Sequence, residues 1–380
     1  MPDASTNPHR LPSFVVPSHY RINLEPNLEN ATFTGTVEIE VEVGQRTDNI
    51  QINSADLIIS SASVLDGVGG ETVASGIEHD EDMERVTLKF DSELSTGPYT
   101  IVARFTGILN DLLHGFYRSV FTDDDGVKHT IATTQFESTH ARRAFPCFDE
   151  PAFKASFGVT LVVPENEFAV SNGPDISTTD LGDGRKSILF EDTMVMSTYL
   201  VAFIVGPFEA TEPIDVDGVP LRIVHPIGKG HLTDYSLEAG AFALKFFSNY
   251  YGIPYPGQKL DMVAVPDFAF GAMENLGCIT YREVLLLVDK SRSTEPELLR
   301  VADVIAHEIA HMWFGDLVTM EWWNGIWLNE AFATFMATMC SDNFNAEWGR
   351  WNQFSLERSM AFDVDSLANT RPIEIGVNSP

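Results

Sequence analysis

The stretch TVEIEVEV, at residues 36–43, decides the first half of the fold. Apolar and acidic or hydroxyl side chains alternate along it without a break. A period of two is the pattern of a half-buried β-strand, because successive side chains point to opposite faces of a sheet. The stretch therefore predicts a sheet with one face towards an apolar core and the other towards water.

Similar short segments recur at residues 85–90, 99–105, 156–163 and 187–191, separated by turns rich in Gly, Asn, Asp and Pro. They predict an antiparallel sandwich or a saddle-like sheet. After about residue 210 the spacing becomes helical, with helices expected at 234–251, 296–315 and 329–344 and strands at 261–265 and 278–288. In a chain of 380 residues this change predicts two domains, 1–209 and 210–380.

Composition excludes several functional classes. The chain has 55 acidic and 24 basic residues, so its net charge is −31. Phosphate backbones and anionic membrane surfaces repel such a chain, which argues against nucleic acid or membrane as a partner. No apolar run approaches the roughly 20 residues that span a bilayer. Three distant cysteines and a polar N-terminal segment favour a reducing, cytoplasmic location.

The sharpest motif is His307-Glu308-Ile309-Ala310-His311, inside an apolar stretch with helical spacing. Residues four apart lie on one helix face, so both imidazoles can reach one ion. Glu308 is rotated by about 100° from His307 and is better placed to hold a water than to bind the metal. The motif predicts a zinc site with Glu308 as general base. Two buried core histidines are the alternative.

A downstream carboxylate argues against that alternative. Glu330 follows His311 after eighteen intervening residues and offers a third ligand. His307, His311 and Glu330 would leave the fourth position of one zinc ion per chain open, which is the mark of a catalytic site. Zinc lowers the pKa of its water to about 7 and polarises a carbonyl. Glu308 would take the water proton and pass it to a leaving amine, so amide hydrolysis is the expected reaction.

At these residues the chain resembles the zinc gluzincin aminopeptidases, the family of aminopeptidase N and puromycin-sensitive aminopeptidase. The sequence Gly271-Ala272-Met273-Glu274-Asn275 is similar to the family's exopeptidase motif, and residues 115–119, 135–151 and 196–200 also look like the family. The resemblance covers essentially all of the chain. It implies a multidomain fold: an all-β N-terminal saddle or sandwich domain, followed by a thermolysin-like α/β (α+β) zinc catalytic domain that is truncated at its C-terminus.

The resemblance also implies roles for individual residues. Glu274 is expected to bind the free α-amino group of a peptide, with Gln135 and Glu137 lining the same pocket. The backbone of Gly271 and Ala272 is expected to approach the substrate closely, and Met273 and Asn275 complete the substrate-binding stretch. Charge-assisted hydrogen bonds to an ammonium group are strong, so the implied partners are peptides with a free N-terminus.

Three departures from the family pattern qualify this expectation. His140 stands where relatives carry Asp. Ala337 stands where many relatives carry a Glu that supports a zinc-binding His, and losing such a group typically costs about 10- to 100-fold in metal affinity or activity. The oxyanion-stabilising Tyr of the family is expected beyond Pro380. By itself the chain is therefore expected to be weakly active or inactive.

Two other functions stay open at this point. One is an epoxide hydrolase with residual peptidase activity, of the leukotriene-processing type, although that branch normally has Gly where this chain has Ala272. The other is a folded but inactive truncated scaffold. The sequence determines neither the preferred N-terminal residue of the substrate nor the oligomeric state.

Overall fold

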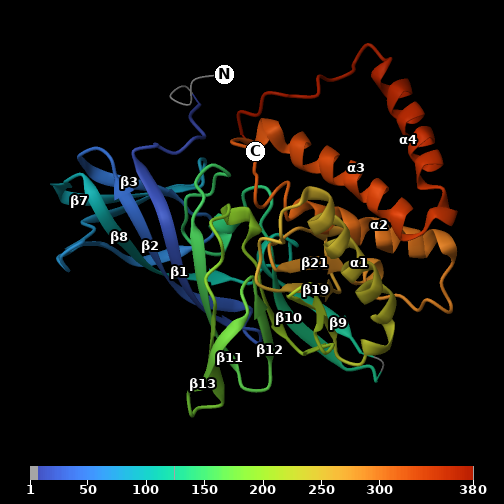
Figure 1. Ribbon diagram of the computed structural model, residues 1–380. Helices are drawn as coiled ribbons and strands as arrows, with labels where there is room; N and C mark the ends of the chain where they lie inside the picture. The colour runs from blue at the N-terminus through green and yellow to red at the C-terminus, as the bar shows by residue number, and fades with distance from the viewer. Residues whose placement is uncertain (1–6, 124, 380) are drawn as a thin grey trace. The chain divides into compact units, whose positions relative to one another are not determined.

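The computed structural model describes residues 7–123 and 125–379 (Figure 1). Contacts divide these residues into two compact units. Unit 1 contains the described residues up to Phe208 together with Asn378 and Ser379, and unit 2 is Glu209–Val377. Each unit is described by itself below.

Unit 1 is built from β-sheets. The spatial order of its eight-stranded sheet is β13 (Asp175–Asp180), β14 (Arg185–Phe190), β11 (Ser156–Pro164), β1 (Val15–Asn27), β2 (Thr32–Val43), β8 (Gly97–Ile108), β4 (Ile58–Asp66) and β5 (Glu71–Val73). A four-stranded sheet has the order β12 (Phe168–Ser171), β15 (Phe203–Gly206), β10 (Lys128–Gln135) and β9 (Gly115–Thr122). A three-stranded sheet has the order β3 (Thr47–Asn53), β7 (Arg85–Leu94) and β6 (Gly76–Asp80).

The alternation at residues 36–43 is confirmed in β2, near the middle of the large sheet. Val37, Ile39 and Val43 are fully buried, whereas Glu38 and Glu40 on the other face are partly exposed. The strand pairs antiparallel with β1 and β8. The β1–β11 pair is parallel, so the sheet is mixed rather than purely antiparallel as expected. Parallel pairing needs a long crossover, and here most of the unit separates the two strands along the chain.

Unit 2 contains a six-stranded sheet covered by helices. The strand order is β16 (Phe208–Ala210), β18 (Val219–Pro226), β19 (Leu260–Val265), β21 (Cys278–Arg282) and β20 (Ala272–Met273), with β17 (Ile214–Val216) paired to β18. Strands β18, β19 and β21 run parallel, and β20 is an antiparallel edge strand. The central strand β19 is buried along its whole length, as expected for a parallel strand with both faces covered.

The helices of unit 2 are α1 (Asp234–Tyr251), α2 (Glu295–His311), α3 (Ile326–Phe344) and α4 (Arg350–Asp365). Helix α2 packs against both α1 and α3 (Figure 1). The bounds of α1 match those predicted, and Gly252 ends it with a left-handed φ of 64°. Helix α4 lies against α3 through the rings of Trp351 and Phe354, which contact Phe335.

Three predicted bounds are wrong. The strand expected at 278–288 ends at Arg282, because the chain then turns into a short 3-10 helix that buries Leu285 and Leu286 against unit 2. The helix expected to reach residue 315 ends at His311. The helix expected from residue 329 begins at Ile326, so Glu330 lies in its second turn rather than at its start. Periodicity locates an element better than its ends.

A strand-rich part followed by a part with helices around a smaller sheet confirms the expected multidomain class. Over the described residues, we find no helix that is both long and apolar enough to cross a membrane.

Candidate metal centre and active site

Helix α2 presents the residues of the His-Glu-x-x-His motif. A capping box begins the helix: the Thr294 backbone N–H donates to the Glu297 carboxylate at 2.7 Å, and Pro296 occupies the first turn. Glu308 lies on the same buried face as Ile305 and Val301, one and two turns earlier in the helix. The position of this carboxylate is therefore set by the packing of the helix.

The two histidines of α2 and a carboxylate of α3 converge. The Nε2 atoms of His307 and His311 are 3.0 Å apart. One carboxylate oxygen of Glu330 lies 3.3 Å from His307 Nε2, and the other lies 3.6 Å from His311 Nε2. The structure thus brings together all three sequence-predicted ligand residues, each offering one atom. Two imidazole nitrogens and one carboxylate oxygen are the donor set that zinc takes in open, catalytic sites.

The outer nitrogen of His311 has a backbone partner. Its Nδ1 donates to the carbonyl oxygen of Phe314 at 2.9 Å, which leaves Nε2 as the acceptor that faces the cluster. Gly315 keeps this arrangement close, because a Cβ there would lie 3.2 Å from His311 Nδ1 and its φ of +143° disfavours other residues. The ring is 1% exposed, so the packing around it fixes its orientation.

The pKa values of His311, His307 and Glu330 are shifted in different directions by their surroundings. Burial, and then the neighbouring His307, lower the pKa of His311 to about 4, so this imidazole is neutral at pH 7. Burial lowers the pKa of His307, but the hydrogen bond with Glu330 and the charges of the nearby carboxylates together outweigh it, and the pKa is raised. The pKa of Glu330 is lowered by the two histidines, although burial alone raises it. A proton shared by His307 and Glu330 would leave when a metal binds.

Two buried carboxylates stand beside the triad. Glu308 is 6% exposed and Glu274 is 3% exposed. One oxygen of each and one ring nitrogen of His311 lie within 4.8 Å of one another. Glu274 Oε1 is 4.0 Å from His311 Nδ1. Unit 2 therefore holds two overlapping groups of residues. His307 and His311 lie beside Glu330, and His311 also lies beside Glu274 and Glu308.

The segment that carries Glu274 is anchored on both sides. Strand β20 pairs Ala272 with Tyr281 and Met273 with Thr280 of β21. Asn275 donates from its side chain to Thr280 Oγ1 at 3.1 Å. The carbonyl of Gly271 accepts a hydrogen bond from the backbone of β21. These contacts hold the predicted stretch 271–275 against the edge of the sheet, where Ala272 and Met273 form the edge strand.

The remaining predicted site residues belong to unit 1. Gln135 is the last residue of β10 and is 1% exposed, and Glu137 follows it after the buried Phe136. Their relation to the metal centre stays a prediction. His140, the first departure from the family pattern, lies against the tilted ring of His114, with ring centroids 4.4 Å apart, and accepts a hydrogen bond from Arg143 Nε at 3.3 Å.

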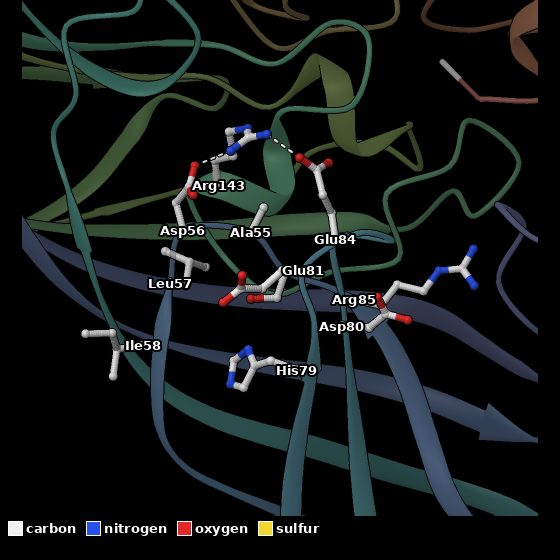
Figure 2. Close-up of a pocket in the computed structure, with 11 residues that line it drawn as sticks. Ala55, Asp56, Leu57, Ile58, His79, Asp80, Glu81, Glu84, Arg85 and Arg143 are labelled. Carbon is white, nitrogen blue, oxygen red and sulfur yellow. Dashed lines mark hydrogen bonds and ion pairs between the residues drawn. The ribbon is translucent and has the colours of Figure 1, made fainter.

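Unit 1 also has a cavity of about 470 Å³ that contains none of the predicted site residues. Part of its charged lining is paired across the cavity. Figure 2 shows Arg143 reaching from one wall to both Asp56 and Glu84. The groups of described residues that could hold a metal ion include no residue of this lining.

Sequence reasoning missed two residues at the centre. Thr334 Oγ1 lies 3.5 Å from His307 Nδ1, and its signal was its position one turn after Glu330. Tyr281 is fully buried, and both its burial and the charge of Glu308 raise the pKa of its phenol. No sequence pattern identifies Tyr281, because the packing of α2 over the sheet brings it near Glu308.

Both parts of the chain match models of a known protein family. Residues 16–200 match the peptidase M1 N-terminal domain, and residues 235–380 match the peptidase family M1 domain. The chain belongs to peptidase family M1. Both matches agree with the order of a strand-rich part before the part that carries the His-Glu-x-x-His motif.

Several curated proteins resemble this M1 chain over almost its whole length. Aminopeptidase M1-A of Oryza sativa subsp. japonica is 44% identical over 372 residues, which are 97% of this chain and 42% of the relative. Puromycin-sensitive aminopeptidase of Caenorhabditis elegans is 40% identical over 381 residues, 100% of this chain and 40% of the relative. Endoplasmic reticulum aminopeptidase 1 of Homo sapiens is 40% identical over 378 residues, 98% of this chain and 40% of the relative. The M1 chain thus spans less than half the length of these relatives.

Proposed function

We propose that this chain carries the metal centre of a zinc-dependent aminopeptidase, which hydrolyses the N-terminal peptide bond of peptides. The observation that carries the proposal is the convergence of His307, His311 and Glu330, with donor atoms 3.0–3.6 Å apart, beside the buried Glu308 and Glu274. Membership of peptidase family M1 and the names of the relatives support the same reaction class.

The three converging residues would hold one zinc ion per chain. When bound, zinc supplies a water of lowered pKa and a polarised substrate carbonyl. Glu308 is the general base: its carboxylate accepts the proton of the attacking water and returns it to the leaving amine. Support comes from its place on α2, between the two histidines in sequence and on the buried face of the helix, where it is held by packing. A positioned base of this kind contributes roughly 10²- to 10⁴-fold to the rate.

The acids beside the triad would select the end of the substrate. Glu274 binds the α-ammonium group of the first residue, with Gln135 and Glu137 in the same subsite, and the 271–275 segment lies along the first peptide bond. Support comes from the burial of Glu274 next to His311, since a desolvated carboxylate binds an ammonium group strongly. Substrates with a blocked N-terminus lack the charge that this subsite binds.

Partners and location follow from the same proposal. Peptides with a free N-terminus are the partners, and a net charge of −31 disfavours nucleic acid. All three cysteines are free and buried, which supports a reducing compartment such as the cytoplasm.

The experiment measures zinc content and the hydrolysis of Leu-, Ala- and Arg-arylamides by the purified chain, with and without chelator. Glu308→Gln should keep its zinc and lose hydrolysis, because Glu308 is a base and not a ligand. Glu295→Gln, an exposed change in the first turn of the same helix, is the matched control. N-acetylated substrates should resist cleavage.

Two outcomes would contradict the proposal. Absence of zinc from the wild-type chain would remove the metal centre, and equal cleavage of blocked and free substrates would remove the aminopeptidase assignment. Stoichiometric zinc without any hydrolysis would instead favour the inactive scaffold.

A further inference from the structure

The two histidines of the centre differ in what holds their outer nitrogens. His311 Nδ1 donates to a backbone carbonyl, that of Phe314, at 2.9 Å. His307 Nδ1 instead lies 3.5 Å from the side-chain oxygen of Thr334, on another helix. A backbone partner cannot be changed by a substitution, but a side-chain partner can. His307 is therefore the histidine whose outer nitrogen is contacted by a side chain that a substitution can change.

Helix geometry places that side chain. Thr334 follows Glu330 by four residues on α3, so both lie on the face that α3 presents to α2. One further turn along the same face, Ala337 is buried and offers only a methyl group. On α2 itself, Asp303 lies one turn before His307, and its negative charge acts on the His307 ring. The Asp303 carboxylate accepts a hydrogen bond from Arg350 at 2.9 Å, so Asp303 is already paired.

The contact between Thr334 and His307 Nδ1 bears on which nitrogen of His307 can bind a metal. A neutral imidazole carries one N–H, and the nitrogen without it is the one that can bind a metal. If Nδ1 carries the hydrogen, Nε2 presents its lone pair towards His311 and Glu330, where the three donor atoms already lie 3.0–3.6 Å apart. In the metal-free chain the carboxylate of Glu330, 3.3 Å from His307 Nε2, favours a hydrogen on that nitrogen. When Nε2 binds a metal, the remaining N–H is on Nδ1, and the hydroxyl oxygen beside it accepts its hydrogen bond.

We propose that Thr334 is a positioning residue: its hydroxyl accepts a hydrogen bond from His307 Nδ1 and thereby fixes the tautomer and the ring orientation that aim Nε2 at the metal centre. The importance of this contact for metal binding rests on the proposed function. Zinc binding by the wild-type chain is therefore measured first, so that failure of the proposed function is seen separately.

The expected effect is moderate. Removing a hydrogen-bond partner of a metal-binding His typically weakens metal binding by about 10- to 100-fold. His307 is partly exposed, with 22% of its side chain accessible, so water can replace part of the lost contact. We therefore expect the lower end of that range, an increase of about 10-fold in the zinc dissociation constant.

The test uses the full chain and three variants. Thr334→Val keeps the branched shape and removes the hydroxyl, whereas Thr334→Ser keeps the hydroxyl. Thr338→Val is the matched control, because Thr338 is a threonine on the same helix whose hydroxyl bonds the Thr334 backbone carbonyl at 3.1 Å. Zinc dissociation constants are measured by competition with a chromophoric chelator. Thr334→Val should bind about 10-fold more weakly, and the other two variants should stay within about 2-fold of wild type.

A second readout follows the hydrogen bond of His307 Nδ1 directly. With ¹⁵N-labelled histidine and His307→Gln to assign the signal among ten histidines, the Nδ1–H signal of His307 is recorded in the zinc-loaded chain. Wild type and Thr334→Ser should show an Nδ1–H that is protected from exchange with water, and Thr334→Val should lose that protection. A general loosening of α3 would not be reversed by Ser.

The outcomes separate this inference from the proposed function. A protected Nδ1–H in Thr334→Val, or its loss in Thr334→Ser, would overturn the role of Thr334 while leaving the metal centre in place. If wild type bound no zinc, the proposed metal centre would fall and this inference with it. Equal zinc affinity in wild type and Thr334→Val would overturn the consequence for metal binding.

Discussion

Asp261 connects the buried strand β19 to the segment that carries Glu274. Its carboxylate accepts hydrogen bonds from Arg222 Nε at 2.8 Å and from Lys259 Nζ at 2.8 Å. The same Lys259 ammonium donates to the carbonyl of Gly277 at 2.8 Å, two residues after Asn275. The carboxylate is 1% exposed and the Lys259 side chain 8% exposed. We predict that Asp261→Asn destabilises unit 2 strongly.

The magnitude follows from burial. Asn has nearly the shape of Asp but no charge, so Lys259 becomes a buried cation without a counter-charge from Asp261. Breaking a buried ion pair in this way costs about 3–5 kcal/mol. Arg222 is 26% exposed and recovers part of its hydration, which points to the lower end, about 3 kcal/mol. Against a typical domain stability of about 5–15 kcal/mol, this is a large loss.

The sign of the pH dependence can also be worked out. Burial alone raises the pKa of Asp261, but Lys259 and Arg222 outweigh it and hold the pKa below its ordinary value. A lowered folded-state pKa gives stability that is present above the unfolded-state pKa of about 3.9 and is lost as the pH falls through the folded-state pKa. The difference between wild type and Asp261→Asn should therefore be full at pH 7 and shrink only in acid below about pH 4.

Urea unfolding followed by tryptophan fluorescence measures this effect in the right unit. All six tryptophans lie within Glu209–Val377, so the signal reports unit 2 alone. With a slope of about 2 kcal/mol per molar urea, the midpoint should fall by about 1.5 M. Asp217→Asn is the matched control: Asp217 pairs with Lys245 at 3.5 Å with both side chains about 60% exposed, and its loss should cost less than about 1 kcal/mol.

Lys259→Met in the Asp261→Asn background gives a second check. Removing the ammonium removes the unpaired buried charge, so the double variant should regain part of the lost stability. If Asp261→Asn shifted the midpoint no more than Asp217→Asn does, the buried network would not hold this part of unit 2. If Lys259→Met made the double variant still less stable, the unpaired cation would not be the cause.

Three further predictions concern other groups. Glu330→Gln should lower zinc affinity by more than about 100-fold, because a direct ligand contributes more than a residue that only hydrogen-bonds to a ligand. The exposed Glu321→Gln is the control, and equal zinc affinity of the two variants in chelator competition would show that Glu330 is not a ligand. Burial, together with the charges of His114, Arg143 and Arg142, lowers the pKa of His140 to about 4, so stability should fall between pH 6.5 and 4, where only the unfolded chain takes up that proton. His140→Asn should lessen this fall in the thermal midpoint measured by circular dichroism, and an unchanged fall would exclude His140 as its source. The Tyr281 hydroxyl is buried without a hydrogen-bond partner among the described residues, so Tyr281→Phe should raise stability by about 1 kcal/mol in the urea assay, and a loss of stability would reveal a partner such as an ordered water.

The sequence alone determined the elements whose patterns are local. The alternation at residues 36–43 depends only on which residues face the core, and β2 follows it residue by residue. The helix predicted at 234–251 is confirmed as α1, because its apolar spacing and the following Gly252 are both local signals. The pair His307 and His311 shares a helix face for the same reason, since spacing within one helix is set by its 3.6-residue turn.

Tertiary structure decided what no local pattern contains. The end of β21 at Arg282 depends on Leu285 and Leu286 finding a core after the strand, which composition does not predict. The distance from Glu330 to the histidines depends on how α3 packs against α2, and eighteen intervening residues can follow many paths. The contact between Thr334 and His307 has the same origin. Patterns of a few residues fix local conformation, whereas side chains from different elements meet only because a close-packed interior leaves their helices and strands one arrangement.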